Sequence, residues 1–196
     1  MTSQHQKSQG VRRKAPPFVA GLVWQPLVVD PRRDIQVYLE DSLSGVYPLD
    51  LEGNHLWKGR VGQPGGHRKY PGPRSTPTVA DGKIYVLGQQ GDLVCFDVKT
   101  KKEAWRENIQ NNFDGRMMSG WKWSESPLVD DGKVVVTPGG SKGALLALNT
   151  KTGEQVWRCK DFTDRAGYSS LIIREIGGIK QYIQLTGDSV AGIDAG

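Results

Sequence analysis

The sequence predicts an all-β fold made of repeated four-stranded antiparallel sheets. In residues 127–157, short apolar runs at 134–136 and 145–148 alternate with turn clusters such as Asp130-Asp131-Gly132. Such alternation is typical of strands joined by tight turns, because aspartate and glycine adopt the backbone conformations that turns need. One sheet of this kind cannot bury both of its faces.

The same pattern recurs at a regular offset. Pro77 precedes Pro127 by 50 positions, and Trp105 precedes Trp157 by 52 positions. A period of four strands in roughly 40 to 50 residues is the sequence signature of a β-propeller, in which each sheet, or blade, packs face to face on its neighbours. We therefore expect further copies along the chain.

The best-preserved copy spans about residues 123–160, and the copy before it spans about 74–108. A degraded copy at about 18–60 ends at Trp57, and a fourth, at about 167–196, holds three strands before Gly196. Trp57, Trp105 and Trp157 close successive copies, so we assign them to packing. The chain is predicted to form three blades and most of a fourth.

Residues 147–157, Ala-Leu-Asn-Thr-Lys-Thr-Gly-Glu-Gln-Val-Trp, resemble the tryptophan-docking motif of the bacterial pyrroloquinoline-quinone-type β-propeller repeat, Ala-x-Asp-x-x-Thr-Gly-x-x-x-Trp. In the copy at 95–105, Lys101 stands where the motif has its glycine. Residues 74–79, 123–129 and 182–187 resemble more narrowly the propellers described as binding-like members of this group. The resemblance implies a ring that commonly has eight blades, of which this chain would supply half.

Half a ring leaves apolar surface uncovered. An open wedge of blades exposes one apolar face at each end, whereas a closed ring covers both. We hypothesise that the chain is a truncated gene product or that two copies close a ring as a homodimer.

The amino-acid composition is typical of a globular protein and does not indicate a particular partner. The 196 residues are 37% hydrophobic and 24% charged, and the 25 glycines and 11 prolines fit an all-β protein with many turns. A formal net charge of +5 permits weak attraction to anionic surfaces. No nucleic-acid motif and no stretch long enough to span a membrane is present, so neither partner is predicted.

The amino-terminal region is predicted to be a leader followed by a first strand. Residues 1–17 are polar and basic and are expected to be disordered. The apolar run at 18–24 is short and is followed by Gln25-Pro26, so we interpret it as a strand and see no signal peptide. The family resemblance nevertheless implies a periplasmic or cell-envelope location.

A candidate ligand site lies in the connection between the second and third copies. Residues 111–125 form a loop about twice the usual length, which carries Arg116, Trp121, Trp123 and Glu125. Arg74 precedes a strand expected to lie innermost, next to the central channel. Clustered aromatic rings with a few charges suit a peptide, a sugar or a quinone. Alternatively, the two tryptophans pack between blades.

The sequence offers no catalytic or metal-binding constellation. His5, His55 and His67 have no spacing suited to zinc or to a nucleophilic triad. Cys95 and Cys159 occupy different places in successive copies, so a disulfide is not expected. We therefore predict no catalytic residues and no metal site.

Two functions follow from these patterns. The leading hypothesis is a non-catalytic binding or scaffolding propeller of the bacterial cell envelope, similar in fold to the propeller lipoprotein of outer-membrane assembly, which holds a peptide, protein or small ligand on its loop face. The alternative is a fragment of a quinone-dependent alcohol or sugar dehydrogenase. Such enzymes use pyrroloquinoline quinone with calcium and an adjacent-cysteine disulfide, and this chain has no adjacent cysteines.

Overall fold

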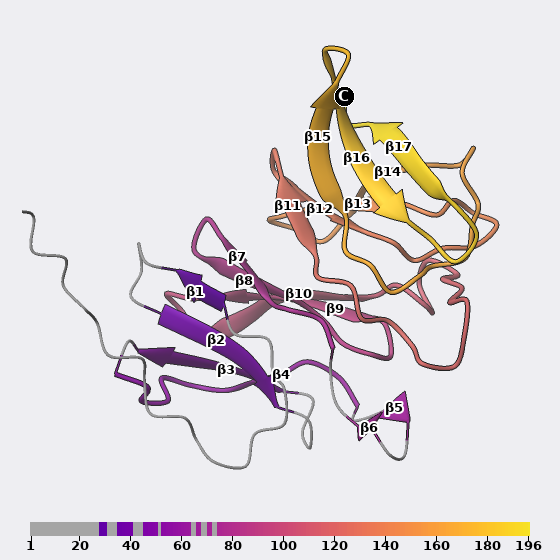
Figure 1. Ribbon diagram of the computed structural model, residues 1–196. Helices are drawn as coiled ribbons and strands as arrows, with labels where there is room; N and C mark the ends of the chain where they lie inside the picture. Colours follow the sequence, from indigo (N-terminus) through magenta and orange to yellow (C-terminus); the bar gives the residue numbers. More distant parts are fainter. Residues whose placement is uncertain are drawn as a thin grey trace, which may run out of the picture.

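The structure is a computed structural model, shown in Figure 1, in which residues 28–30, 35–40, 45–50, 52–63, 66–67, 70–71 and 74–196 are described. The predicted leader at 1–17 and the predicted strand at 18–24 lie outside these residues. Every regular element within them is a β-strand.

Four antiparallel meanders make up the fold. The first contains β1 (Val28–Asp30), β2 (Ile35–Glu40), β3 (Gly45–Asp50) and β4 (Gly59–Arg60). The second contains β7 (Thr78–Ala80), β8 (Lys83–Leu87), β9 (Asp92–Asp97) and β10 (Lys102–Asn108). The third contains β11 (Leu128–Asp130), β12 (Lys133–Val136), β13 (Leu146–Asn149) and β14 (Gln155–Arg158). The fourth contains β15 (Ile172–Ile176), β16 (Ile179–Leu185) and β17 (Val190–Asp194).

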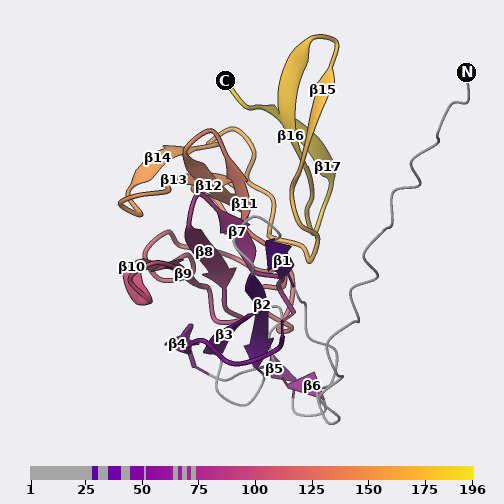
Figure 2. The ribbon, with the colours of Figure 1, turned by 90° about the vertical axis from the view of Figure 1, so that its left-hand side faces the viewer.

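These sheets confirm the predicted β-propeller fold of three four-stranded blades and a three-stranded one. Figure 2 shows them following one another in chain order, from the indigo first sheet to the yellow fourth. The first strands of the first three sheets are innermost, because β7 lies beside both β1 and β11. A small two-stranded ribbon, β5 (Gly66–His67) and β6 (Tyr70–Pro71), lies in the segment between the first and second sheets.

Alternating side chains of one strand enter two different cores. Ile84 and Val86 of β8 pack with the first sheet, whereas Tyr85 and Leu87 pack with the third. Successive side chains of a strand point to opposite faces, so a sheet that is covered on both faces needs apolar residues in sequence. This requirement explains the unbroken apolar runs in β8 and in β12.

The tryptophan that ends each of the first three sheets contacts the sheet that follows. The rings of Trp57 and Phe96 are 5.6 Å apart, and those of Trp157 and Tyr182 are 6.0 Å apart. Trp105 is buried, and its indole N–H donates to the Thr150 carbonyl at 3.0 Å.

The turn that faces Trp105 needs a small residue. A Cβ placed on Gly153 would lie 2.9 Å from the Trp105 ring, and Gly153 has a φ of +77°. Both observations favour glycine, because a side chain would clash and other residues rarely adopt this φ. In the second sheet Lys101 takes the equivalent turn position with a φ of +62°, at the cost of backbone strain.

The fourth sheet exposes a row of large apolar side chains. Ile176, Ile179, Leu185 and Val190 are each about half or more exposed. The opposite face of the same sheet is covered, since Tyr182 packs against the third sheet. The equivalent outward faces of the second and third sheets are covered by the next sheet along the chain.

Trp105→Ala is expected to lower the free energy of unfolding by about 3 to 5 kcal/mol, because it removes a buried ring and the hydrogen bond to Thr150. Urea unfolding followed by circular dichroism measures the change. Trp121→Ala is the matched control, since Trp121 is 40% exposed, and it should alter stability by less than about 1 kcal/mol. Equal losses in both variants would contradict the proposed role of Trp105.

Candidate functional site

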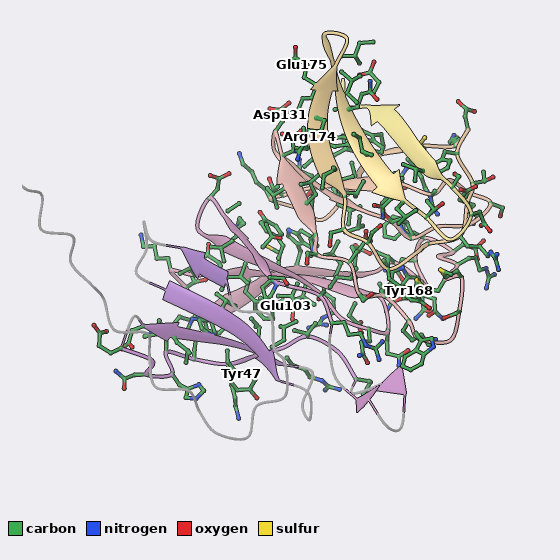
Figure 3. All side chains as sticks on the ribbon, in the orientation of Figure 1. Tyr47, Glu103, Asp131, Tyr168, Arg174 and Glu175 are labelled. Atoms are coloured by element: carbon green, nitrogen blue, oxygen red, sulfur yellow. The ribbon has the colours of Figure 1, made fainter. Side chains whose placement is uncertain are left out.

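Two connections between blades, residues 109–127 and 159–171, lie at one end of the sheets, which we call the loop face. Residues 137–145, which join the antiparallel strands β12 and β13 within the third sheet, lie at the same end. Figure 3 shows Tyr168 toward this end of the fourth sheet, whereas Arg174 and Glu175 lie near the hairpin at the other end.

The loop at 109–127 is held by hydrogen bonds to three sheets. Its Trp123 N–H donates to the Gln89 carbonyl at 3.3 Å, and its Arg116 N–H donates to the Pro138 carbonyl at 2.9 Å. Its Met118 N–H donates to the Ala166 carbonyl at 3.0 Å, next to the fourth sheet. A long loop tied at so many points is a rigid platform for side chains.

Two predicted site residues, Arg74 and Trp121, lie together on this face. The Arg74 guanidinium donates to the Trp121 carbonyl at 2.9 Å, and its central carbon lies 5.0 Å from the centre of the indole ring. A cation above an indole face is attracted by the electron-rich ring. Arg74 therefore fixes both the backbone and the ring of Trp121.

Exposed side chains from two neighbouring segments complete what we call the loop-face patch, made of Arg74, Met118, Ser119, Trp121 and Tyr168. The hydroxyl groups of Ser119 and Tyr168 share a hydrogen bond. Met118, Trp121 and Tyr168 are each about 40% exposed. Aromatic and thioether groups held in place but open to solvent are typical of binding surfaces for proteins and peptides.

Two further residues of the predicted site, Trp123 and Glu125, are buried. Trp123 is 2% exposed, and its indole N–H donates to the Thr137 carbonyl at 3.2 Å. Glu125 is also 2% exposed, and its carboxyl oxygen accepts the Thr137 N–H at 2.5 Å. The two side chains thus meet at Thr137, inside the fold. Their ligand-binding role stays a prediction.

Glu125 belongs to a buried polar network between the third and fourth sheets. The Gln184 amide donates to the Thr137 hydroxyl at 2.7 Å and to the Ser169 carbonyl at 3.1 Å, and it lies 3.5 Å from the Glu125 carboxyl. Burial raises the pKa of Glu125 to about 7, and the hydrogen bonds from Thr137 offset this only in part. The Glu125 carboxyl therefore keeps its proton up to about pH 7.

Arg116 lies apart from these residues. Its guanidinium is mostly exposed and forms an ion pair with Asp114 at 3.0 Å. The predicted site is therefore divided: Arg74 and Trp121 at the patch, Trp123 and Glu125 in the interior, and Arg116 elsewhere on the loop.

Tyr168 and Gln184 were not among the predicted site residues. The strand register places Arg74, Ser124 and Tyr168 at the same position of successive copies, four residues before Thr78, Leu128 and Ile172. An alignment of the copies would therefore have placed Tyr168 at the position of Arg74 and indicated it as a site residue. No sequence signal indicated Gln184, whose position in β12 is taken by Val136.

The described residues do not fit a quinone and calcium site. Within the described part of the chain, no three His, Cys, Asp or Glu side chains gather in a way that suits a metal ion. Cys95 is buried, Cys159 is partly buried, and both are free. The buried Glu125 carboxyl is taken up by Thr137 and Gln184. We therefore derive no chemistry through such a cofactor.

Blade topology, closing tryptophans and the repeat sequence together define a β-propeller protein of the pyrroloquinoline-quinone-type repeat class. The chain belongs to the family described as outer membrane protein assembly factor BamB, whose family model matches residues 33–196.

Similar proteins divide between assembly factors and dehydrogenases. The outer membrane protein assembly factor BamB of Xanthomonas campestris pv. campestris is 34% identical over 111 residues, which are 54% of this chain and 25% of that protein. Quinohemoprotein alcohol dehydrogenase ADH-IIG of Pseudomonas putida is 30% identical over 149 residues, 70% of this chain and 19% of that protein. The chain thus spans a quarter or less of these relatives.

A solved structure supports the fold. The crystal structure of BamB from Moraxella catarrhalis aligns with a TM-score of 0.56 and 21% identity, over 87% of this chain and 45% of that one. In addition, no helix of the described residues is long and apolar enough to cross a membrane.

Glu125→Gln is expected to change how stability depends on pH. The folded pKa of about 7 exceeds the ordinary value of 4.5, so the folded state holds a proton that the unfolded state has lost between these pH values. The unfolding free energy therefore falls as pH rises through this window. Glutamine stays neutral, so the variant should gain on the order of 3 kcal/mol relative to the wild type between pH 4 and pH 8. Urea unfolding across this range measures it.

Glu175→Gln is the control for this prediction, since Glu175 is exposed. Its stability should follow the wild type at every pH. Parallel profiles for Glu125→Gln and the wild type would show that the Glu125 carboxyl is not protonated in the folded protein.

Proposed function

We propose that this chain is a non-catalytic binding or scaffolding propeller of the bacterial cell envelope, which holds a peptide or a partner protein on its loop face. The observation that carries the proposal is the loop-face patch, where the side chains of Met118, Trp121 and Tyr168 are exposed. Hydrogen bonds hold the Trp121 carbonyl, the Met118 N–H and the Tyr168 hydroxyl in place. The names of the assembly-factor relatives agree with an envelope location and with protein partners.

The chemistry of the patch suits an extended apolar segment. Trp121 and Tyr168 offer large rings with little conformational freedom to lose, and Met118 adapts to irregular shapes. Arg74 and Ser119 add a charge and a hydroxyl at the edge of these rings. Interfaces draw most of their energy from a few such residues, so a small patch can anchor a partner.

A quinone-dependent dehydrogenase fragment is the second candidate. The similarity to the Pseudomonas putida enzyme over 149 residues favours it. Calorimetric titration with pyrroloquinoline quinone and calcium separates the two functions, because only a dehydrogenase site requires both to bind. Tight binding of the pair would favour the dehydrogenase.

A second copy of the chain is the proposed cover for the fourth sheet. The exposed row of Ile176, Ile179, Leu185 and Val190 is the kind of surface that a further blade covers inside a ring. Light scattering on the purified chain tests this homodimer. A mass of twice 21.6 kDa is expected, and a mass of 21.6 kDa at all concentrations would exclude it.

The double variant Trp121→Ala and Tyr168→Ala is expected to lose the partner without losing the fold, because both side chains are exposed. The immobilised chain is incubated with a solubilised bacterial envelope preparation, and retained proteins are identified by mass spectrometry. Outer membrane proteins, or proteins that assemble them, are expected, with recovery reduced about tenfold or more in the variant.

Val156→Ala is the matched control, since Val156 is 50% exposed on the outer strand β14, away from the patch. It should retain the same proteins as the wild type. If the Trp121→Ala and Tyr168→Ala variant retained the same proteins in the same amounts as the wild type, the loop-face patch would not be the binding surface.

A further inference from the structure

A pocket of about 450 Å³ lies at the outer end of the third sheet, and its lining is strongly basic. Lys142, Arg158 and Lys160 contribute three positive charges, and no carboxylate is among the lining residues. The side chains of Asn112 and Gln155 add amide groups, and Phe113 supplies one apolar wall. We call this the rim pocket.

The positive charge of the rim pocket is not neutralised by the fold. Among the described residues, no carboxylate lies within ion-pair distance of Lys142, Arg158 or Lys160. Asp114 acts on the charge of Arg158 but is itself paired with Arg116 at 3.0 Å. The Glu107 carboxylate accepts the amide of the pocket residue Asn112 at 2.6 Å and forms no ion pair with the three cations.

The second sheet shows the same place with its charge neutralised. There, Arg106 donates to the Glu103 carboxylate at 2.7 Å and lies 4.0 Å from Asp92. The Asn108 amide donates to Asp92 at 3.2 Å. Two carboxylates of the chain thus surround the arginine in this blade.

Strand pairing identifies the equivalent residues in the third sheet. Arg106 pairs with Val94 and Arg158 pairs with Leu146, so the two arginines occupy the same position. On the same register, Glu103 becomes Gln155, Asp92 becomes Ala144 and Asn108 becomes Lys160. The third blade has therefore lost both carboxylates and gained an ammonium group.

Arg158 keeps the structural role of its counterpart. Arg106 donates to the carbonyls of Arg60 and Val61, and Arg158 donates to those of Phe113, Gly139 and Gly143. Its N–H groups donate to these carbonyls, and its positively charged side chain lines the rim pocket. Lys142 and Lys160 are exposed and are the groups that can reach a ligand.

We propose that the rim pocket binds paired carboxylates of an acidic segment in a partner protein, which take the place of the two carboxylates that the second blade supplies internally. This proposal rests on the proposed function as a protein-binding propeller and names a second contact surface for the partner. Ligand carboxylates contact Lys142 and Lys160, with the Gln155 amide as a further donor.

Paired carboxylates fit better than a single small anion. Exposed ion pairs are individually weak, because water and salt screen them, so one anionic group gains little from two flexible lysines. Several carboxylates on one segment engage both ammonium groups at once, and the linkage raises their effective concentration.

The test is binding of a fluorescein-labelled hexaglutamate peptide to the full chain, measured by anisotropy. Lys142→Gln with Lys160→Gln should weaken binding about tenfold or more, and binding should fall steeply as salt rises. Gln155→Glu should weaken it as well, because this change restores the internal carboxylate that Arg106 has in Glu103. Gln155 is exposed, so the fold should tolerate the change.

Lys99→Gln with Lys151→Gln is the matched control. Both lysines are exposed in turns at the end of the sheets opposite the loop face, and their loss changes net charge by the same amount. Binding should stay within about twofold of the wild type. An equal loss in control and pocket variants would overturn the proposal in favour of general attraction to a basic protein, as would failure of hexaglutamate to bind.

Competition identifies the source of the anion. Glutarate, a free dicarboxylate, should displace the peptide only at much higher concentration than unlabelled hexaglutamate, and inorganic phosphate should be weaker still. Stronger displacement by phosphate or glutarate than by hexaglutamate would overturn the assignment to an acidic segment. Trp121→Ala with Tyr168→Ala should leave hexaglutamate binding intact. The proposal for the rim pocket and the proposal for the loop-face patch are therefore tested independently.

Discussion

Face-to-face packing of antiparallel sheets is the constraint on which this structure depends. The second and third sheets are covered on both faces, so neighbouring residues of one strand, such as Ile84 and Tyr85, enter different cores. The middle strands of these sheets, such as β8 and β12, therefore carry unbroken apolar runs. Charged and polar side chains lie on the outer strands, at strand ends and in loops, and the loop-face patch and the rim pocket are built from these parts.

Polar contacts at the inner ends of the sheets fix how successive blades meet. The Ser126 hydroxyl accepts the Thr76 N–H, and the Ser126 N–H donates to the Ser170 hydroxyl, both at 2.8 Å. The network of Glu125, Thr137 and Gln184 adds buried bonds between the third and fourth sheets. Such satisfied networks are directional, so they set the relative position of blades that apolar packing alone leaves free.

Repetition separates scaffold from function in this chain. Residues that recur make similar contacts outside their own sheet. Trp105 and Trp157 each contact the sheet that follows, whereas Arg106 and Arg158 each donate to a carbonyl that precedes their own sheet, that of Val61 and that of Phe113. Departures from the repeat mark the surfaces where the blades differ. The exchange of Glu103 for Gln155 is a local change in charge that leaves the backbone scaffold in place.

The sequence by itself determined the class of fold, because strand alternation, turn residues and closing tryptophans are local signals and several copies repeat them. It also indicated the long loop that carries Trp121, and singled out Arg74 before the second copy. Tertiary structure alone decided that Trp123 and Glu125 are buried, that Tyr168 joins Trp121, and that Lys142 and Lys160 line one pocket. Each of these depends on hydrogen bonds and packing between residues of different blades, and distances of that kind are not encoded in the spacing of one repeat.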